Sequence, residues 1–300
     1  MKSLVVRAGL SLPLVAAAMA APVAYDGFGN GPLADLNNSN GGTGWTSPWI
    51  DLTSGEVSSI ALPGLTYPRL PSTPGAAVTP PSAVGYGAAD YNRTFPVPAG
   101  NDMYISFLLR PDNGYGSAGL AFGPYMQVGV PLTLSTYGLR LGRYLFVDSG
   151  IPVVQGETKL LVLHIAVSGT TTTFKLYVNP NLAQGEPATP SAVQALGGIV
   201  KPGFIELMND GGFTTDEIRV ATTWGDATTP PPCPADLDNG SMTGTPDGGV
   251  DINDLLYFLL VYEMGSIRAD LDNGSGLGIP DGGVDINDLL YFLAHYEAGC

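Results

Sequence analysis

The sequence predicts a mainly β protein, in which a β-sandwich is followed by a small α-helical module. Between residues 25 and 224 the chain is rich in Gly, Pro, Thr and aromatic residues, and short alternating or β-branched runs follow one another without intervening helices. After residue 228 the composition changes, and a loop followed by an apolar helix occurs twice. We therefore expect a sandwich domain at 21–227, a proline-rich linker at 228–234 and a helical module at 235–300.

The first 20 residues are expected to be a signal peptide. Lys2 and Arg7 precede an apolar run at 10–18, which leads into a small-residue pattern that ends at Ala20. A membrane anchor is the weaker alternative, because the run is short and Pro13 interrupts it. We expect cleavage after Ala20, no membrane span in the mature chain, and a secreted or cell-surface location.

Strand-like segments dominate the first domain, and they favour a sandwich or jelly roll. A single segment, 191–196, looks helical. The predicted strands are 103–109, 120–130, 160–167, 172–178, 204–208 and 217–222.

Acidic residues are concentrated near the end of the chain. Of the 27 acidic residues, 12 lie between Asp236 and Glu297, where Arg268 is the only basic residue. Such a surface would repel phosphate, so we expect no nucleic-acid partner. Clustered acids without compensating bases instead favour a bound cation.

The last part of the chain contains two near-identical units. Residues 235–265 and 269–299 share 25 of 31 positions at an offset of 34, without a gap. The acids of each loop follow an EF-hand-like order, with ligands at positions 1, 3, 5, 7, 9 and 12, once a seven-residue insertion after position 3 loops out. The predicted ligands are Asp236, Asp238, Asp247, Gly249, Asp251 and Asp254 in the first loop, and Asp270, Asp272, Asp281, Gly283, Asp285 and Asp288 in the second.

The chemistry of these loops favours calcium, with one ion in each. Oxygen ligands without His or Cys suit a hard cation, and a flexible cage of carboxylates suits calcium better than magnesium. The alternative is a cluster of Asp, Asn and Gly turns that only solvates a linker. Such turns would need neither a duplicate nor the apolar Val250 at position 8.

An apolar helix follows each loop. Five side chains of each helix share one stripe, and we expect both stripes to form the core between the two helices, about a pseudo-twofold axis. They are Leu255, Leu256, Phe258, Leu259 and Tyr262, and Leu289, Leu290, Phe292, Leu293 and Tyr296.

The repeated loop and helix units resemble a dockerin, most closely the bacterial GC-type dockerins, whose chain ends in Gly-Cys, here Gly299-Cys300. The resemblance covers 233–300, and it implies docking to a cohesin-like or other surface protein. Cellulosomal dockerins lack the insertion found here, and they use a Ser-Thr-type pair at loop positions 10 and 11 to choose the cohesin. In this chain the corresponding partner-binding positions hold Ile252 and Asn253, and Ile286 and Asn287.

Cys233 and Cys300 are the two cysteines of the chain, and they flank the module. A disulfide between them would stabilise the module by roughly 4 kcal/mol. The alternative is a terminal Gly-Cys signal whose thiol is used for processing or covalent attachment.

Scattered strings of the first domain resemble the concanavalin A-like, laminin-G-like jelly rolls of secreted bacterial proteins. They are 25–28, 41–45, 176–180, and 216–220 with Trp224. The resemblance implies that the first and last strands pair. It also implies that the domain binds a glycan, such as a polysaccharide. Trp45, Trp49, Tyr67 and Trp224 are candidates for stacking on sugar rings, with core packing as the alternative for each.

The sandwich is expected to be non-catalytic. Hydrolases of this fold carry a Glu-x-Asp-x-x-Glu string on one strand, which this sequence lacks. Glu206 and Asp210 have the spacing of a carboxyl pair, but Asp210 falls in an expected turn. His164 lies in an apolar strand, where a buried, hydrogen-bonded role is expected rather than that of a general base.

The sequence therefore predicts an exported, non-catalytic protein. Its sandwich would recognise a glycan or serve as structure, and its calcium-binding module would dock it to a partner. One alternative is a polysaccharide-degrading glycoside hydrolase carried by the same module. A second is a structural component of the cell surface.

Overall fold

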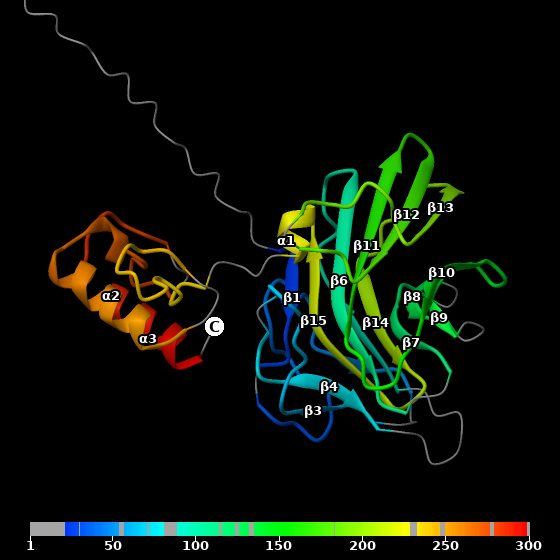
Figure 1. The fold of residues 1–300 in the computed structure, drawn as a ribbon, viewed down its shortest axis with the longest axis horizontal. Coiled ribbons are helices and arrows are strands. Elements are labelled where there is room, and N and C mark those ends of the chain that lie inside the picture. Colours follow the sequence, from blue (N-terminus) through cyan, green and yellow to red (C-terminus); the bar gives the residue numbers. More distant parts are fainter. Residues whose placement is uncertain are drawn as a thin grey trace, which may run out of the picture.

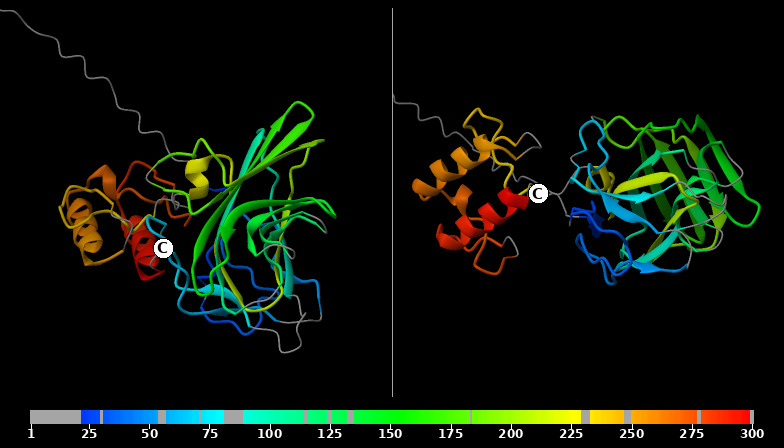
Figure 2. Two further views of the ribbon diagram at one scale, coloured as in Figure 1. Left: turned by 45° about the vertical axis from the view of Figure 1, so that its right-hand side comes forward. Right: turned by 90° about the horizontal axis from the view of Figure 1, so that it is seen from below.

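The computed structural model shows a mainly β fold, with two antiparallel sheets packed face to face and few helices (Figure 1). Figure 2 shows the sheets from two further directions as twisted, curved layers. The structure describes residues 22–29, 31–53, 57–70, 72–80, 89–113, 116–123, 126–131, 135–182, 184–228, 233–246, 250–276 and 279–298.

The two sheets are called sheet A and sheet B. Among the described residues, sheet A has the strand order β13-β12-β11-β6-β15-β4-β3, with β1 also pairing with β15, and sheet B has the order β10-β9-β8-β7-β14-β5-β2. The strands of sheet A are β1 (Ala24–Asp26), β3 (Ser59–Ala61), β4 (Ala76–Thr79), β6 (Asp102–Pro111), β11 (Lys159–Ser168), β12 (Thr171–Val178), β13 (Ala192–Gly197) and β15 (Phe213–Ala221). Those of sheet B are β2 (Ile50–Asp51), β5 (Ala89–Thr94), β7 (Ala118–Ala121), β8 (Met126–Val130), β9 (Thr136–Leu141), β10 (Phe146–Pro152) and β14 (Phe204–Asn209).

The main hydrophobic core lies between the sheets, because the strands alternate apolar side chains toward it. Phe107 of sheet A and Leu207 of sheet B, for example, are both fully buried there. A second cluster covers the outer face of sheet A, around Leu108 and Val162, beneath the short helix α1 (Trp224–Thr228). Sheet A is therefore covered on both faces near its middle, which explains why every residue of β15 is buried.

Several strand predictions are confirmed. The segments 103–109, 160–167, 172–178 and 204–208 lie within β6, β11, β12 and β14. The first strand pairs with the last, with Tyr25 opposite Arg219.

Three predictions about this domain were wrong in part. The segment 120–130 forms two strands, because the backbone reverses at Gly123, whose φ is +107°. The segment 191–196 is not a helix but most of β13, since pairing with β12 overrides its weak helical pattern. The last strand begins at Phe213 rather than at residue 217, because its first residues pair with both β4 and β6.

The C-terminal module contains α2 (Ile252–Glu263), the 3₁₀ turn η1 (Ile267–Ala269) and α3 (Ile286–Ala298). Phe258 and Phe292 occupy equivalent positions in the two repeats, and their fully buried rings stack with centroids 4.0 Å apart and planes at 2°. Equivalent residues therefore meet each other, as expected for helices related by a pseudo-twofold axis.

The predicted stripe of each helix is only partly core. Leu256 and Leu259 of α2 are exposed, as are their equivalents in α3, while Tyr257 and Val261 are buried. The buried face is thus rotated relative to the predicted stripe. Two short helices cannot cover apolar faces this wide, because their contact is a narrow seam around the two phenylalanines. None of the helices described is long and apolar enough to cross a membrane.

Candidate functional site

The first loop of the module gathers three buried acids. Asp236, Asp238 and Asp254 are each less than one tenth exposed. Asp254 fastens the start of the loop to the start of α2, because its Oδ1 accepts hydrogen bonds from the backbone N–H groups of Leu237 (2.6 Å) and Asp238 (2.8 Å). Its Oδ2 accepts one from the N–H of Asp251 (2.8 Å). The carboxylate at position 12 of the predicted loop therefore holds the backbone at positions 2 and 3.

The second loop repeats this geometry. Asp288 Oδ1 accepts from the N–H groups of Leu271 (2.6 Å) and Asp272 (2.9 Å), and its Oδ2 accepts from Asp285 (2.7 Å). Asp270, at position 1, accepts from the N–H groups of Asp281 (3.0 Å) and Gly282 (2.8 Å) at positions 5 and 6. The chain therefore folds back across the insertion, which brings both ends of the predicted ligand sequence together.

The acid at loop position 9 is also a helix cap. Asp251 accepts a hydrogen bond from the N–H of Asn253 (2.7 Å), and with Asp254 it completes a capping box at the start of α2. Asp285 accepts in the same way from Asn287 (2.7 Å). Both acids thus stabilise the helices from the loop side.

The insertion of the first loop wraps around Asp238. Burial acts to raise the pKa of this carboxyl group, but N–H donation from Met242, Gly244 and Thr243 outweighs it and lowers the pKa. The pKa of Asp288 is lowered in the same way, by N–H donors that outweigh burial. Both carboxyl groups are held in the ionised form that a cation requires.

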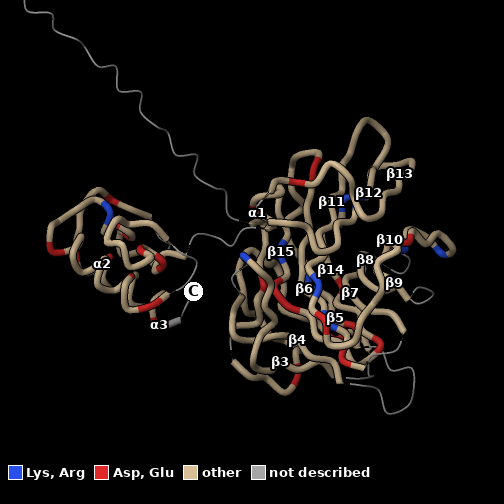
Figure 3. Tube along the Cα trace, in the orientation of Figure 1, with Lys and Arg blue, Asp and Glu red and all other residues tan. Residues whose placement is uncertain are grey.

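The donor set fits a hard cation, because it consists of carboxylate and backbone oxygens. Figure 3 shows acidic segments, in red, along this part of the chain. Its single basic residue in the sequence is Arg268. That side chain donates to Thr243 O (3.2 Å) and Tyr257 Oη (2.6 Å). Among the described residues, however, no three acidic, His or Cys side chains converge on one point, since the carboxylates bond to backbone N–H groups instead. Asp247 and Gly249 lie outside the described residues.

The predicted partner-binding positions differ in their surroundings. Ile252 and Ile286 are both 57% exposed, whereas the Asn253 and Asn287 side chains donate to Oδ2 of the acids two residues before them. Sequence reasoning missed the exposed leucines that continue the surface of these isoleucines, because it assigned the whole stripe to the core. We use the name docking face for Ile252, Leu256, Leu259, Ile286, Leu290 and Leu293, all of which are at least 40% exposed.

The predicted disulfide and the predicted signal peptide both include residues outside the described part of the chain. Cys233 packs against the hydrophobic cluster of the module. Cys300, residues 1–21 and residues 229–232 of the linker lie outside the described residues.

The four candidate sugar-stacking aromatics are occupied by structural contacts. Trp49 is fully buried in the core and donates to Asp26, so core packing is the role that the structure gives it. Trp45 donates from its indole N–H to a backbone carbonyl (2.8 Å) and packs edge-on against Phe95. Tyr67 and Trp224 are half-buried and contact residues of the outer cluster on sheet A.

His164 is buried and hydrogen-bonded, as predicted. Its Nδ1 lies 2.7 Å from Glu186 Oε1, and its Nε2 lies 2.8 Å from Asp102 Oδ1. Glu186 also accepts from the hydroxyl groups of Tyr104 and Tyr177. Burial acts to raise the pKa of Glu186, but the hydrogen bonds from Tyr177, His164 and Tyr104 lower it. This cluster fastens the β12–β13 connection to sheet A.

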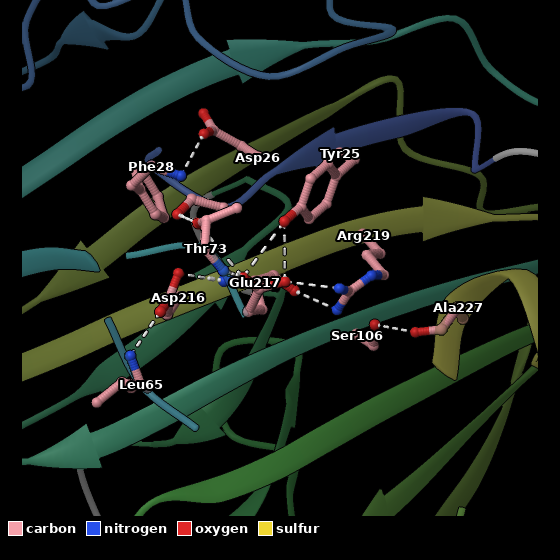
Figure 4. Close-up of polar contacts among 11 residues, drawn as sticks. Tyr25, Asp26, Phe28, Leu65, Thr73, Ser106, Asp216, Glu217, Arg219 and Ala227 are labelled. Carbon is pink, nitrogen blue, oxygen red and sulfur yellow. Dashed lines mark hydrogen bonds and ion pairs between the residues drawn. The ribbon is translucent and has the colours of Figure 1, made fainter. Parts of the chain in front are cut away.

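A buried charged network lies where β1 meets β15 (Figure 4). Glu217 accepts from Arg219 (2.6 Å), Tyr25 (3.0 Å) and the N–H of Thr73 (2.7 Å). Burial raises the pKa of the neighbouring Asp216 to about 9. Asp216, Glu217 and Arg219 are fully buried. We therefore interpret the network as a structural attachment of the loop before β4 to β15, and not as a reactive site.

The acid nearest to Glu206 in the fold is not Asp210, the one four residues later in the chain. Asp210 lies in a turn, where it accepts from the N–H (2.9 Å) and hydroxyl (3.1 Å) of Ser117. Asp90 of β5 is instead the acid beside Glu206, since Met208 pairs with Asp90 and Glu206 with Asn92. Burial, and then the charge of Glu206, raise the pKa of Asp90 to about 6, while burial raises the pKa of Glu206. No sequence pattern could indicate that these two acids are neighbours, because β5 and β14 are far apart in the chain.

No known family model and no curated protein matches this chain. Among solved structures, it is similar to the cellulose-induced protein Cip1, at 15% identity over 60% of this chain and 91% of the other, with a TM-score of 0.40. It is also similar to domain 4 of AbnA, an extracellular arabinanase of Geobacillus stearothermophilus, at 14% identity over 69% and 97% of the two chains (TM-score 0.36). A third is the endo-1,3-β-glucanase of Streptomyces sioyaensis, at 12% identity over 67% and 95% (TM-score 0.37). These TM-scores are too low to carry an argument about the activity of this chain.

Proposed function

We propose that this is an exported, glycan-binding protein that docks to a surface protein through a calcium-stabilised C-terminal module. The observation that carries this proposal is the docking face, which presents equivalent apolar side chains on both helices of a small acidic module. Exposed aliphatic side chains in this number are costly for a secreted domain unless a partner covers them. The partner would be a cohesin-like or other surface protein with an apolar surface of its own.

Calcium would act on this face through the loops. Asp236, Asp238 and Asp254 would hold one ion together with Asp247, Gly249 and Asp251, and the equivalent residues of the second loop would hold another. A bound ion neutralises carboxylates that repel one another at close range, which fixes the loops that begin both helices. The spacing of α2 and α3, and with it the shape of the docking face, would then depend on calcium.

The cysteines and the signal peptide would support the same docking role. A disulfide between Cys233 and Cys300 would join the two ends of the module, in the oxidising environment that export through a signal peptide provides. The sandwich would supply recognition, and the proline-rich linker would separate it from the module.

A calcium titration and a docking assay test this proposal on the mature full-length chain. Calorimetry should show two calcium ions bound, and surface proteins of the source cell should be captured in calcium but not in EDTA. The variant Leu256→Asp with Leu290→Asp should bind calcium normally and lose the capture. A matched control, Val193→Asp, changes an exposed apolar residue of β13 and should retain it. Equal capture with and without calcium, or by both variants, would contradict the proposal.

A second candidate function is a glycoside hydrolase, and the presence of Asp90 near Glu206 on neighbouring strands favours it. Hydrolysis needs one carboxylic acid to protonate the leaving oxygen and one carboxylate to activate water or attack the sugar. The raised pKa values of both groups suit an acid of this kind. Release of reducing sugar from a polysaccharide panel, abolished by Glu206→Gln, would establish this function. Binding without release would leave the recognition function in place.

A further inference from the structure

We propose that the outer face of sheet B, at Asp90, Gln127 and Glu206, binds the hydroxyl groups of an uncharged glycan segment. This inference rests on the glycan-binding function proposed above and locates its binding site on sheet B. It concerns the strands β5, β14, β7 and β8, and none of the aromatic residues that the sequence suggested.

Strand register brings these side chains to one face. Asn92, Glu206, Ala121 and Gln127 are successive partners across the four strands, so they form one row. Their chain neighbours Tyr91, Leu207, Leu120 and Val128 belong to the core between the sheets, so the row itself points away from that core. Asp90 and Met208 pair in the next row of the same face.

The hydrogen bonding of Gln127 also points to a ligand. It is only 2% exposed, and its Nε2 donates to the carbonyl of Ala118 (3.3 Å), whereas its Oε1 is buried and has no hydrogen-bond partner among the described residues. The Oδ1 atom of Asp90 is likewise buried and unpartnered in the described part of the chain. A buried acceptor without a donor costs about 1–3 kcal/mol, which a donating ligand would relieve.

The backbone beside Gln127 carries glycines in place of residues with side chains. Gly119 and Gly129 pair directly, and a Cβ atom on either would lie 2.2 Å from a carbonyl oxygen of the neighbouring strand. Their φ angles of +129° and +139° also disfavour any other residue. This part of the face therefore carries no side chains of its own, and Gln127 can lie along it.

The chemistry of the face selects the class of ligand. Asp90 and Gln127 present acceptors, so the ligand must supply donors, as sugar hydroxyl groups do. The charges of Glu206, Asp210 and Asp51 all act on Asp90, which opposes an acidic sugar group at that end of the row. A metal ion is a poorer fit, since no convergent group of three acidic, His or Cys ligands occurs among the described residues. Phe204 lies on the same strand face as Glu206, where its ring can cover the apolar side of a sugar.

Binding of the mature full-length chain to an oligosaccharide array tests the inference. The array should carry neutral gluco-, xylo-, manno- and galacto-oligosaccharides, with polyuronates and chitosan oligomers as charged counterparts. We expect binding to at least one neutral series and none to the polyuronates. Asp90→Ala and Gln127→Ala should each weaken that binding tenfold or more. Asp148→Asn, which removes an exposed acid of the same sheet on β10, should change it less than twofold.

Circular dichroism and a thermal melt should first show that each variant is folded. If Gln127→Ala is not, Glu206→Gln replaces it with the same expected loss. Unchanged neutral-glycan binding in the folded variants would overturn this assignment and leave the proposed function standing. Preference for polyuronates or chitosan would overturn the assignment of ligand class. A folded chain that binds no glycan would overturn both this inference and the glycan half of the proposed function.

Discussion

Replacing Asp288 by Asn should cost the module about 1.5–3 kcal/mol of stability and one calcium ion. The carboxylate accepts three backbone N–H groups, two on Oδ1 and one on Oδ2. An amide can still accept at one oxygen, but its NH₂ group would face the third N–H. The loss is that of one charge-assisted hydrogen bond, about 1.5–3 kcal/mol, which here is also part of a helix cap.

Calcium should enlarge this effect. At a concentration 100 times its Kd, a bound ion adds about 2.7 kcal/mol to the free energy of unfolding, and the variant would lose that contribution at the second loop. In EDTA the effect should be smaller, because removing one of several close carboxylates also relieves repulsion. Calorimetric stoichiometry and thermal unfolding, each with and without calcium, measure both parts.

The matched control is Glu297→Gln, which removes the same charge from an exposed position on the same helix. It should bind two ions and unfold like the unaltered chain. If Asp288→Asn also bound two ions, the register of the second loop would be wrong. If both variants lost the same stability, general charge rather than loop closure would be responsible.

Three further predictions follow from burial and charge. Glu217→Ala should destabilise the sandwich by about 3–5 kcal/mol, because it leaves buried Arg219 without its carboxylate, and adding Arg219→Met should restore part of the loss in a denaturant titration. In the module, Phe258→Ala should cost about 3–5 kcal/mol but the exposed Leu256→Ser less than about 0.5 kcal/mol, and similar losses would place Leu256 in the core after all. Because the pKa of Asp288 is lowered in the folded state, its stabilisation should be complete above the ordinary Asp range near pH 4 and should disappear as pH falls through the folded value. Acid titration in EDTA should show this loss, and Asp288→Asn should lack it.

The sequence predicted local features of this protein better than the contacts between distant segments. The strand at 160–167 and the duplicated loops follow from short patterns, and the structure has them. The strand β13 was mistaken for a helix because its conformation is set by pairing with β12 and not by its own residues. The proximity of Asp90 to Glu206 could not be predicted for the same reason, since it depends on the order of the strands in the sheet. Periodicity likewise placed Leu256 on an apolar stripe but could not say how much of that stripe a partner helix covers.

The module shows where its two repeats are equivalent and where they are not. The carboxylates at position 12 bind the same backbone groups, and Phe258 stacks on its own counterpart, so loops and core obey the pseudo-symmetry. The six differing pairs of residues lie in the insertion and near the helix ends. There Val261 is buried, whereas its counterpart His295 lies beside Tyr291 with the two rings tilted by 43°. The first halves of α2 and α3 begin with the same exposed isoleucine and carry the same exposed leucine one turn later. A partner that reads those halves would meet the same surface in two orientations half a turn apart, whereas a partner that reads the helix ends would meet two different surfaces.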